Sequence, residues 1–279
     1  MALRIGNLIG RIWFLIDRKH QKIAISNLTL AFGKEKDSRE IRILAREVFK
    51  NLGQILFEIG WSLHLKHKDF NKYFHIRGLS NYKTAYEKNK GVLALTAHIG
   101  NWEFLSIIAE MTGYQVRVLY RPLDFQPLNQ FFTEFRTRFD STELIPSAHA
   151  MRKILKSLKD GKVITLLMDQ NVDWYEGVFV DFFGRRACTN KGLAILALKT
   201  EAPVMPVFLV REGSGFVAEF FPELPLIKTG DKTKDIEENT ERYNQVIESF
   251  IRKYPAQWFW VHNRWKTRPY QTIKTSEVS

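Results

Sequence analysis

The sequence predicts an α/β fold with a mostly parallel central sheet, helices on both faces and an N-terminal helical segment. Short apolar runs alternate with segments of helical periodicity: 91–97 with 101–112, 114–120 with 127–139, and 162–168 with 150–160. Strands that alternate with helices are typical of parallel sheets covered on both sides. The 279 residues, 45% of them apolar, suffice for one such domain, and no composition break marks a boundary. We therefore expect a single domain over 1–279.

The first residues predict an amphipathic helix instead of a membrane span. Arg4, Asn7 and Arg11 interrupt the apolar positions, and the unbroken apolar run 12–16 is too short to cross a bilayer. No small-residue cleavage site of a secretory signal follows it. Such a helix either lies on a membrane, where each basic residue contributes about 1 kcal/mol toward anionic lipid, or packs on the protein's own core. We expect residues 1–65 to form a helical, membrane-proximal part.

A long helix is expected next, followed by an α/β core over 91–265. Asp37 and Glu40 have the spacing of a capping box, and apolar residues recur after them at helical spacing. In the second half, 202–210 predicts a strand, and 215–221 predicts an antiparallel neighbour after the turn at 212–215. Residues 236–254 predict a helix that ends before Pro255. The polar tail 270–279 is expected to be frayed.

Charge and cysteine content limit the possible partners. The formal net charge of +12 favours anionic partners, whether nucleic acid, an anionic membrane or an acidic protein. Cys188 is the single cysteine, so an intramolecular disulfide is excluded and a reducing compartment is indicated. The sequence contains no CxxC pair and no cluster of histidines that would indicate a metal site. The aromatic residues lie in apolar strand patterns and no nucleic-acid-binding motif occurs, which argues against a nucleic-acid partner.

The stretch TAHIGNWE (96–103) contains the candidate catalytic pair. His98 follows a predicted strand at its carboxyl end, where open α/β sheets bind ligands, and Glu103 falls in the next helix's first turn. A carboxylate that accepts a hydrogen bond from one imidazole nitrogen leaves the other nitrogen free as a general base. Gly100 permits the turn and Asn101 is placed to cap the helix. Taken by itself, this pattern is more often a loop histidine beside a helix-terminal carboxylate, without catalytic function.

No serine or cysteine of this stretch looks like an activated nucleophile, so the base is expected to act directly on a substrate hydroxyl or on water. TAHIGNWE resembles the motif, a histidine and an acidic residue separated by four positions, of glycerolipid and lysophospholipid acyltransferases. In this form it is most similar to the lipid A biosynthesis family, the late acyltransferases. Further blocks resemble that family in the same order: 17–33, 120–132, 166–171, 177–208 and 258–269. The likeness covers nearly the whole chain.

The resemblance implies transfer of a fatty acyl group from acyl carrier protein to a hydroxyl of an anionic lipid A precursor. His98 would deprotonate that hydroxyl, and Glu103 would orient and charge-stabilise His98. No cofactor is implied beyond the acyl thioester as co-substrate. The place would be the cytoplasmic face of the bacterial inner membrane, with peripheral or weak attachment. Acylation of another glycolipid or a lysophospholipid, from acyl-CoA, and a non-catalytic lipid- or nucleic-acid-binding protein are the alternatives.

The family blocks supply further candidate site residues. Arg121 is a candidate for the cation that stabilises the oxyanion or contacts a phosphate, or else forms a surface ion pair. Asp169 and Gln170, at a strand end, are assigned to the acceptor site with Asn101, although strand-end Asp residues are also common caps and turn residues. Thr189 and Lys191 are expected to open a helix that meets a phosphate, with Thr189 as a plain N-cap being the alternative.

Two features concern the membrane. Members of the family commonly begin with a longer apolar anchor, and this chain starts at a point that the family reaches only after it. Either the start is truncated, or attachment relies on the short helix and the positive surface. The closing aromatic block is expected in the core, or else at the level of lipid headgroups together with its basic neighbours, as follows: Trp258, Trp260, Arg264, Trp265, Lys266 and Arg268.

Overall fold

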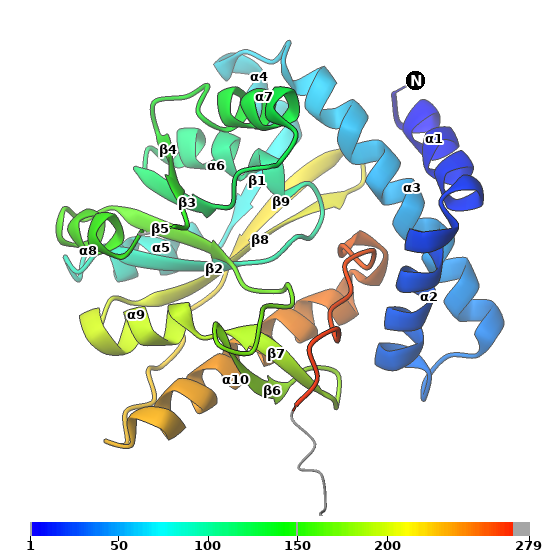
Figure 1. The fold of residues 1–279 in the computed structure, drawn as a ribbon. Coiled ribbons are helices and arrows are strands. Elements are labelled where there is room, and N and C mark those ends of the chain that lie inside the picture. The colour runs from blue at the N-terminus through cyan, green and yellow to red at the C-terminus, as the bar shows by residue number, and fades with distance from the viewer. Residues whose placement is uncertain (1, 149, 270–279) are drawn as a thin grey trace, which may run out of the picture.

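The computed structural model describes residues 2–148 and 150–269, and it confirms the α/β fold (Figure 1). His149 and the expected frayed tail 270–279 lie outside the described residues. The sheet has seven strands in the order β1-β9-β8-β2-β5-β3-β4, and only the β8–β9 pair is antiparallel. The expected antiparallel neighbour at 215–221 is therefore confirmed.

The central strands are buried on both faces, which explains why they are nearly continuous apolar runs and do not alternate with polar residues. The strands of the large sheet are β1 (Phe74–Arg77), β2 (Val92–Thr96), β3 (Val116–Tyr120), β4 (Thr142–Pro146), β5 (Val163–Leu167), β8 (Val204–Glu212) and β9 (Gly215–Phe220). Thr96 at the end of β2 lies level with Leu167 at the end of β5. This register brings the residues that follow the two strands together.

Helices cover both faces of the sheet, with α6 and α7 above it and α9 and α10 below it in Figure 1. An N-terminal group consists of α1 (Ala2–Ile16), α2 (Arg18–Phe32) and α3 (Ser38–Ser62). The remaining helices are α4 (His67–Tyr73), α5 (Leu79–Tyr86), η1 (Trp102–Phe104), α6 (Leu105–Thr112), α7 (Gln126–Arg136), α8 (Met151–Lys159), α9 (Gly192–Thr200), α10 (Lys232–Lys253) and η2 (Pro255–Gln257). The capping box of Asp37 and Glu40 is present at the start of α3.

A small antiparallel sheet of β6 (Gly177–Asp181) and β7 (Arg186–Asn190) was not expected from the sequence. Thr189 belongs to β7, so the expectation that it opens a helix or caps it is wrong; Lys191 occupies the cap position before α9. The strand pattern was hidden because β7 (RACTN) carries polar residues on both faces.

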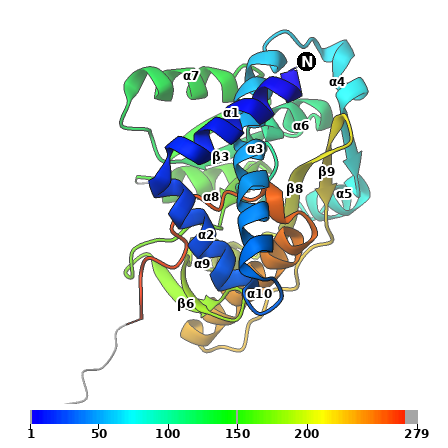
Figure 2. The same ribbon diagram turned by 90° about the vertical axis from the view of Figure 1, so that its right-hand side faces the viewer.

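The N-terminal helices pack on each other through glycines. Asp17 separates α1 from α2 and accepts a hydrogen bond from the backbone N–H of His20. Where α1 crosses the outer side of α3 (Figure 2), a Cβ atom at Gly10 would overlap the backbone of Phe49 and Lys50. The two helix backbones approach so closely only because glycine stands there. One face of α1 is therefore committed to the protein's own core, as one of the two expectations had it.

We expect Gly10→Ala to lower the free energy of unfolding by about 1–3 kcal/mol, because the added methyl group forces α1 away from α3. Gly60→Ala is the matched control: Gly60 lies exposed in α3, a Cβ atom added there would meet no other atom within 4 Å, and this exchange should stabilise the helix by about 0.5–1 kcal/mol. Thermal and denaturant unfolding measure both. Equal stability of Gly10→Ala and the natural chain would contradict the close packing.

Candidate active site

The loop after β2 places His98 at the carboxyl edge of the sheet. Gly100 adopts a positive φ of 61°, and a Cβ there would overlap the backbone of Leu209, so glycine is required at this turn. The closing segment holds the loop from the other side: Gly100 N–H donates to Gln257 O at 2.9 Å, and Phe259 N–H donates to His98 O at 3.0 Å. The position of the imidazole is therefore fixed by backbone contacts on both sides.

A buried carboxylate orients the His98 ring, and it is that of Asp169. Asp169 Oδ1 lies 2.9 Å from Nδ1 of His98, while Oδ2 accepts from the His98 backbone N–H at 3.1 Å and from Trp258 Nε1 at 2.7 Å. Burial opposes ionisation, but the charge of His98 and the hydrogen bonds from His98 and Trp258 lower the pKa of the Asp169 carboxyl. An ionised Asp169 accepts a hydrogen bond from Nδ1–H, so Nε2 of His98 is left as the acceptor nitrogen.

The expected hydrogen bond between His98 and Glu103 is corrected by this geometry, since none joins them within residues 2–148. Glu103 instead accepts two bonds from Arg136, at 2.7 Å each, and one from Trp102 Nε1 at 2.9 Å. Burial disfavours the charged form of Arg136, but the hydrogen bonds to Glu103 and its negative charge raise the pKa of the Arg136 guanidinium. Glu103 still lies near the histidine, because the Trp102 ring that it binds contacts His98 with 5.1 Å between ring centroids.

The register of the sheet explains the exchange of partners. Because β2 and β5 are parallel neighbours with Thr96 level with Leu167, the positions two residues further on, His98 and Asp169, face each other at the edge. Asp169 was expected at this edge but in the acceptor site, so its position is confirmed and its partner is new. The catalytic role of Glu103 stays a prediction.

The other sequence candidates lie at different depths. Asn101 is fully buried and donates its side-chain amide to Glu58 Oε2 at 3.0 Å, without capping a helix. Thr189 is also fully buried and accepts hydrogen bonds from Asn244 and Arg264. The structure thus places both inside the protein and away from a surface that a substrate reaches.

Three candidates are accessible. Gln170, next to Asp169, and Lys191, before α9, are partly exposed. Arg121 is exposed after β3. The hydrogen bond between Tyr175 and Asp173 raises the pKa of the Tyr175 phenol. The positive charge of Arg121 acts on the same phenol and opposes this rise. Arg121 therefore lies near the loop that follows β5.

The contribution of the closing segment was not predicted from the sequence. His262 accepts a hydrogen bond from Asn171 N–H at its Nε2 atom, at 2.9 Å, and burial lowers its pKa to about 4. Arg264 is fully buried and donates to the backbone carbonyl of Cys188 at 2.8 Å; burial lowers its pKa to about 10. Trp258 and Trp260 are also fully buried, so their alternative place at the headgroup level is wrong and the core expectation is confirmed.

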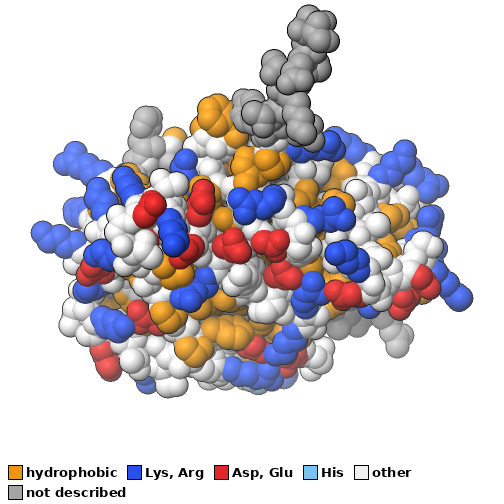
Figure 3. Space-filling model, turned by 90° about the horizontal axis from the view of Figure 1, so that it is seen from below, with side chains coloured by type: hydrophobic (Ala, Val, Ile, Leu, Met, Phe, Trp, Pro, Cys, Tyr) orange, Lys and Arg blue, Asp and Glu red, His pale blue; other side chains and the backbone are white. Residues whose placement is uncertain are grey.

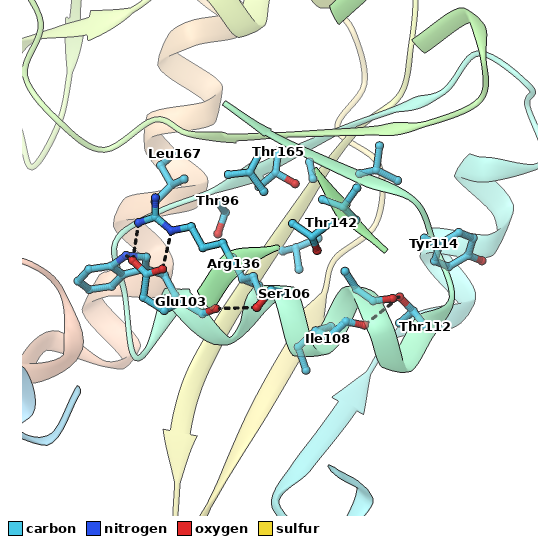
Figure 4. Close-up of a pocket in the computed structure, with 18 of the residues that line it drawn as sticks. Thr96, Glu103, Ser106, Ile108, Thr112, Tyr114, Arg136, Thr142, Thr165 and Leu167 are labelled. Atoms are coloured by element: carbon cyan, nitrogen blue, oxygen red, sulfur yellow. Dashed lines mark hydrogen bonds and ion pairs between the residues drawn. The ribbon is translucent and has the colours of Figure 1, made fainter. Parts of the chain in front are cut away.

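An apolar cavity of about 70 Å³ lies between α6 and the sheet, beside this site. Its walls are strand residues such as Ala94, Val118 and Val163, and α6 residues such as Ile108. Glu103 and Arg136 stand at one end and Tyr114 at the other (Figure 4). Trp102 lines the cavity and contacts the His98 ring, so the indole ring separates the cavity from the imidazole.

Within residues 2–148 and 150–269, no group of three or more His, Cys, Asp or Glu side chains is placed to hold a metal ion. Among the described helices, none combines the length and the apolar character needed to cross a bilayer.

Comparisons with known proteins agree with the motifs. The family model described as "Bacterial lipid A biosynthesis acyltransferase" matches residues 1–267. The chain is 28% identical over 273 residues to the lipid A biosynthesis palmitoleoyltransferase of Escherichia coli (strain K12), covering 95% of this chain and 85% of that protein. It is 26% identical over 271 residues to the lipid A biosynthesis lauroyltransferase of the same strain, with 95% and 85% covered. The phosphatidylinositol mannoside acyltransferase of Mycolicibacterium smegmatis is 26% identical over 186 residues, with 65% and 59% covered.

The partly buried His262 makes stability depend on pH. Its folded pKa of about 4 lies below the ordinary histidine value of 6.5, so the unfolded chain binds more protons between these values. The contribution of His262 to the free energy of unfolding is therefore fully present above the unfolded pKa. It falls as the pH decreases, by about 2 kcal/mol between pH 7 and pH 5. His262→Gln, which keeps an acceptor for Asn171 N–H but does not titrate, should reduce this slope. Denaturant unfolding at pH 7 and pH 5 measures the loss of stability in the natural chain and in His262→Gln. An equal loss in the two proteins would contradict the assignment to His262.

Proposed function

Because this chain belongs to the bacterial lipid A biosynthesis acyltransferase family, we propose that it moves a fatty acyl group from acyl carrier protein to a hydroxyl of a lipid A precursor. Its membership makes it an acyltransferase of lipid A biosynthesis. The observation that carries the finer proposal is the His98–Asp169 pair, which only the ring of Trp102 separates from an apolar cavity. A reaction between a lipid alcohol and a fatty acyl thioester requires a base close to an apolar binding site.

His98 is the general base. Its Nδ1–H proton is held by Asp169, and Nε2 takes the proton of the acceptor hydroxyl while the hydroxyl oxygen attacks the thioester carbonyl carbon. The tetrahedral intermediate collapses as the carbon–sulfur bond breaks, and the leaving thiolate takes the proton back from the imidazolium. The buried negative charge of Asp169 stabilises that imidazolium. A well-placed base contributes roughly 10²–10⁴-fold in rate.

Glu103 acts on His98 through Trp102. Glu103 accepts a hydrogen bond from the indole N–H, and the indole ring packs against the imidazole. Because Arg136 neutralises Glu103, the pair fixes Trp102 without adding net charge next to the base. Glu103 is therefore a positioning residue in this proposal, and Arg121 remains a candidate for an anionic group of either substrate.

The cavity receives the first few carbons of the donor's acyl chain, next to the thioester. Its walls come from apolar positions of β2, β3, β5 and α6, and burying apolar surface contributes roughly 25 cal/mol per Å². The cavity starts at Trp102, next to the base, so a chain inside it leaves its thioester carbon near His98.

The face of α1 that turns away from α3 is proposed to lie on the membrane. It carries the exposed apolar side chains Ile5, Leu8, Ile12, Leu15 and Ile16, with Arg11, Arg18 and Lys19 exposed beside them. By contrast, the face seen from below in Figure 1 mixes acidic and basic side chains (Figure 3). On α10, acidic and basic residues form the pairs Lys234–Glu238 and Arg252–Glu248. The combination of apolar and basic groups on α1 suits an anionic lipid surface.

The catalytic proposal is tested with pure protein, two thioester donors and a panel of lipid acceptors, with the product masses read directly. His98→Ala should abolish turnover, and Asp169→Asn should lower kcat by roughly 10²–10⁴-fold, because the amide does not hold the Nδ1–H tautomer. Asp160→Asn, on the exposed end of α8, is the matched control and should keep the activity. Turnover of Asp169→Asn at the natural rate would contradict the proposed mechanism. Turnover with the acyl-CoA donor but not with the acyl carrier protein donor would rule out acyl carrier protein as the source of the acyl group.

Membrane attachment is tested by vesicle sedimentation. Replacing both Leu8 and Leu15 with Glu should weaken binding to vesicles that contain anionic phospholipid by at least about tenfold, because two apolar contacts are lost and negative charge is added. Met151→Glu, on the exposed side of α8, is the control and should bind like the natural chain. Unchanged binding of the double variant would show that α1 is not the attachment site.

A further inference from the structure

Every charged side chain of helix α8 is basic. The helix buries Ile154 and Leu158. Its four cations are all exposed to solvent: Arg152, Lys153, Lys156 and Lys159. None of them forms an ion pair in the part of the chain that the structure describes. Basic side chains line the left edge of the molecule in Figure 3, which is the side on which α8 lies in Figure 1.

The local energetics of the helix do not favour this arrangement. Arg152 and Lys153 stand in the first turn, where positive charge opposes the helix dipole, and no acidic residue of that turn compensates them. Arg152, Lys156 and Lys159 recur at i, i+4 and i+7, so like charges are neighbours in one row. Residues that break such local rules are expected at functional sites, and a row of cations suits an anionic partner.

The strand register places the start of α8 near the edge of the sheet that carries His98. Pro146, the last residue of β4, lies level with Tyr120 on β3, and Ser147 N–H donates to Tyr120 O at 2.9 Å. Three strand spacings of roughly 4.8 Å separate β4 from β2, so this end of β4 is about 14 Å from the strand that precedes His98. Since α8 runs back from there to the start of β5, Arg152 is near its end that is closer to the site.

The position of α8 favours a soluble partner over a lipid surface. In Figure 1, α8 and α1 lie at opposite sides of the molecule, and in Figure 2, α1 lies in front and α8 behind it. A membrane that contacts α1 therefore does not reach α8. Over its whole described length, α8 also exposes only one large apolar side chain, that of Met151, whereas a helix that lies on a bilayer needs an apolar face.

We propose that the exposed row of cations on α8 is the docking surface for the acyl carrier protein that delivers the donor. The inference rests on the proposed function, in which the donor is a thioester of acyl carrier protein, and it adds the surface that receives the carrier. Acyl carrier proteins are acidic, and complementary charges speed the encounter of two proteins and fix their orientation. The thioester stands at the end of a long, flexible prosthetic arm, so the carrier docks beside the site while its arm reaches His98.

The test reverses two charges of the row in the full chain. One variant combines Arg152→Glu with Lys156→Glu. The matched control combines Lys68→Glu with Lys72→Glu, two exposed positions with the same spacing on α4. Binding of holo acyl carrier protein is measured by fluorescence anisotropy. Transfer is measured with dodecanoyl acyl carrier protein and with dodecanoyl-pantetheine, a neutral thioester that lacks the protein.

The α8 variant should bind holo acyl carrier protein at least about tenfold more weakly at low salt, and its KM for dodecanoyl acyl carrier protein should rise by a similar factor with kcat unchanged. Its kcat/KM for dodecanoyl-pantetheine should equal that of the natural chain, because the reacting groups are untouched. The α4 control should match the natural chain with both donors. Added salt should weaken carrier binding by the natural chain more than by the α8 variant.

Unchanged carrier binding by the α8 variant, or an equal loss in the α4 control, would overturn the inference. So would an equal loss of transfer from both donors, because that result places the effect in the site itself. Weaker sedimentation of the α8 variant with anionic vesicles, at unchanged carrier binding, would assign the row to lipid and overturn it too. Carrier binding that depends on α8, without transfer from either donor, would support the docking surface and contradict the proposed acyl transfer instead.

Discussion

The buried carboxylate of Asp169 is the group on which the site depends. Removing a charge from water costs several kcal/mol unless hydrogen bonds and opposite charge compensate it. Here the compensation comes from three donors: the backbone and the ring of His98, and the indole of Trp258. The fully buried Arg264 adds a positive charge that acts on the same carboxylate. The groups that make this burial tolerable are therefore those that fix the catalytic imidazole, so stability and catalysis share one cluster.

A second buried network holds the turn after His98. Glu58 on α3 forms an ion pair with Arg211 on β8 and accepts a hydrogen bond from Asn101. The side chain of Gln257 pairs with the backbone N–H and carbonyl groups of Arg211, and its own carbonyl accepts from Gly100 N–H. The turn is thus tied to the N-terminal helices, the sheet and the closing segment. Since α3 also carries α1, the surface proposed for the membrane and the loop of the base belong to one packed unit.

Sequence patterns located most elements, because apolar runs and helical periodicity report burial directly. The position of His98 at the sheet edge followed from the strand that precedes it. The partner of His98 did not, because Asp169 reaches it only through the adjacency of β2 and β5, which is set by tertiary packing. Glu103, closer in sequence, turns to Arg136 on α7, a contact between segments that no local spacing reveals. Thr189 was misplaced for a similar reason, since polar residues concealed a short hairpin strand.

The central claim is that Asp169 holds His98 in the tautomer that leaves Nε2 free to accept a proton. Long-range proton–nitrogen correlation spectra of the neutral His98 ring measure the tautomer directly. We expect the neutral ring to carry its proton on Nδ1 in the natural chain, and we expect Asp169→Asn to disturb this state. A neutral ring protonated on Nε2 in the natural chain would contradict the claim.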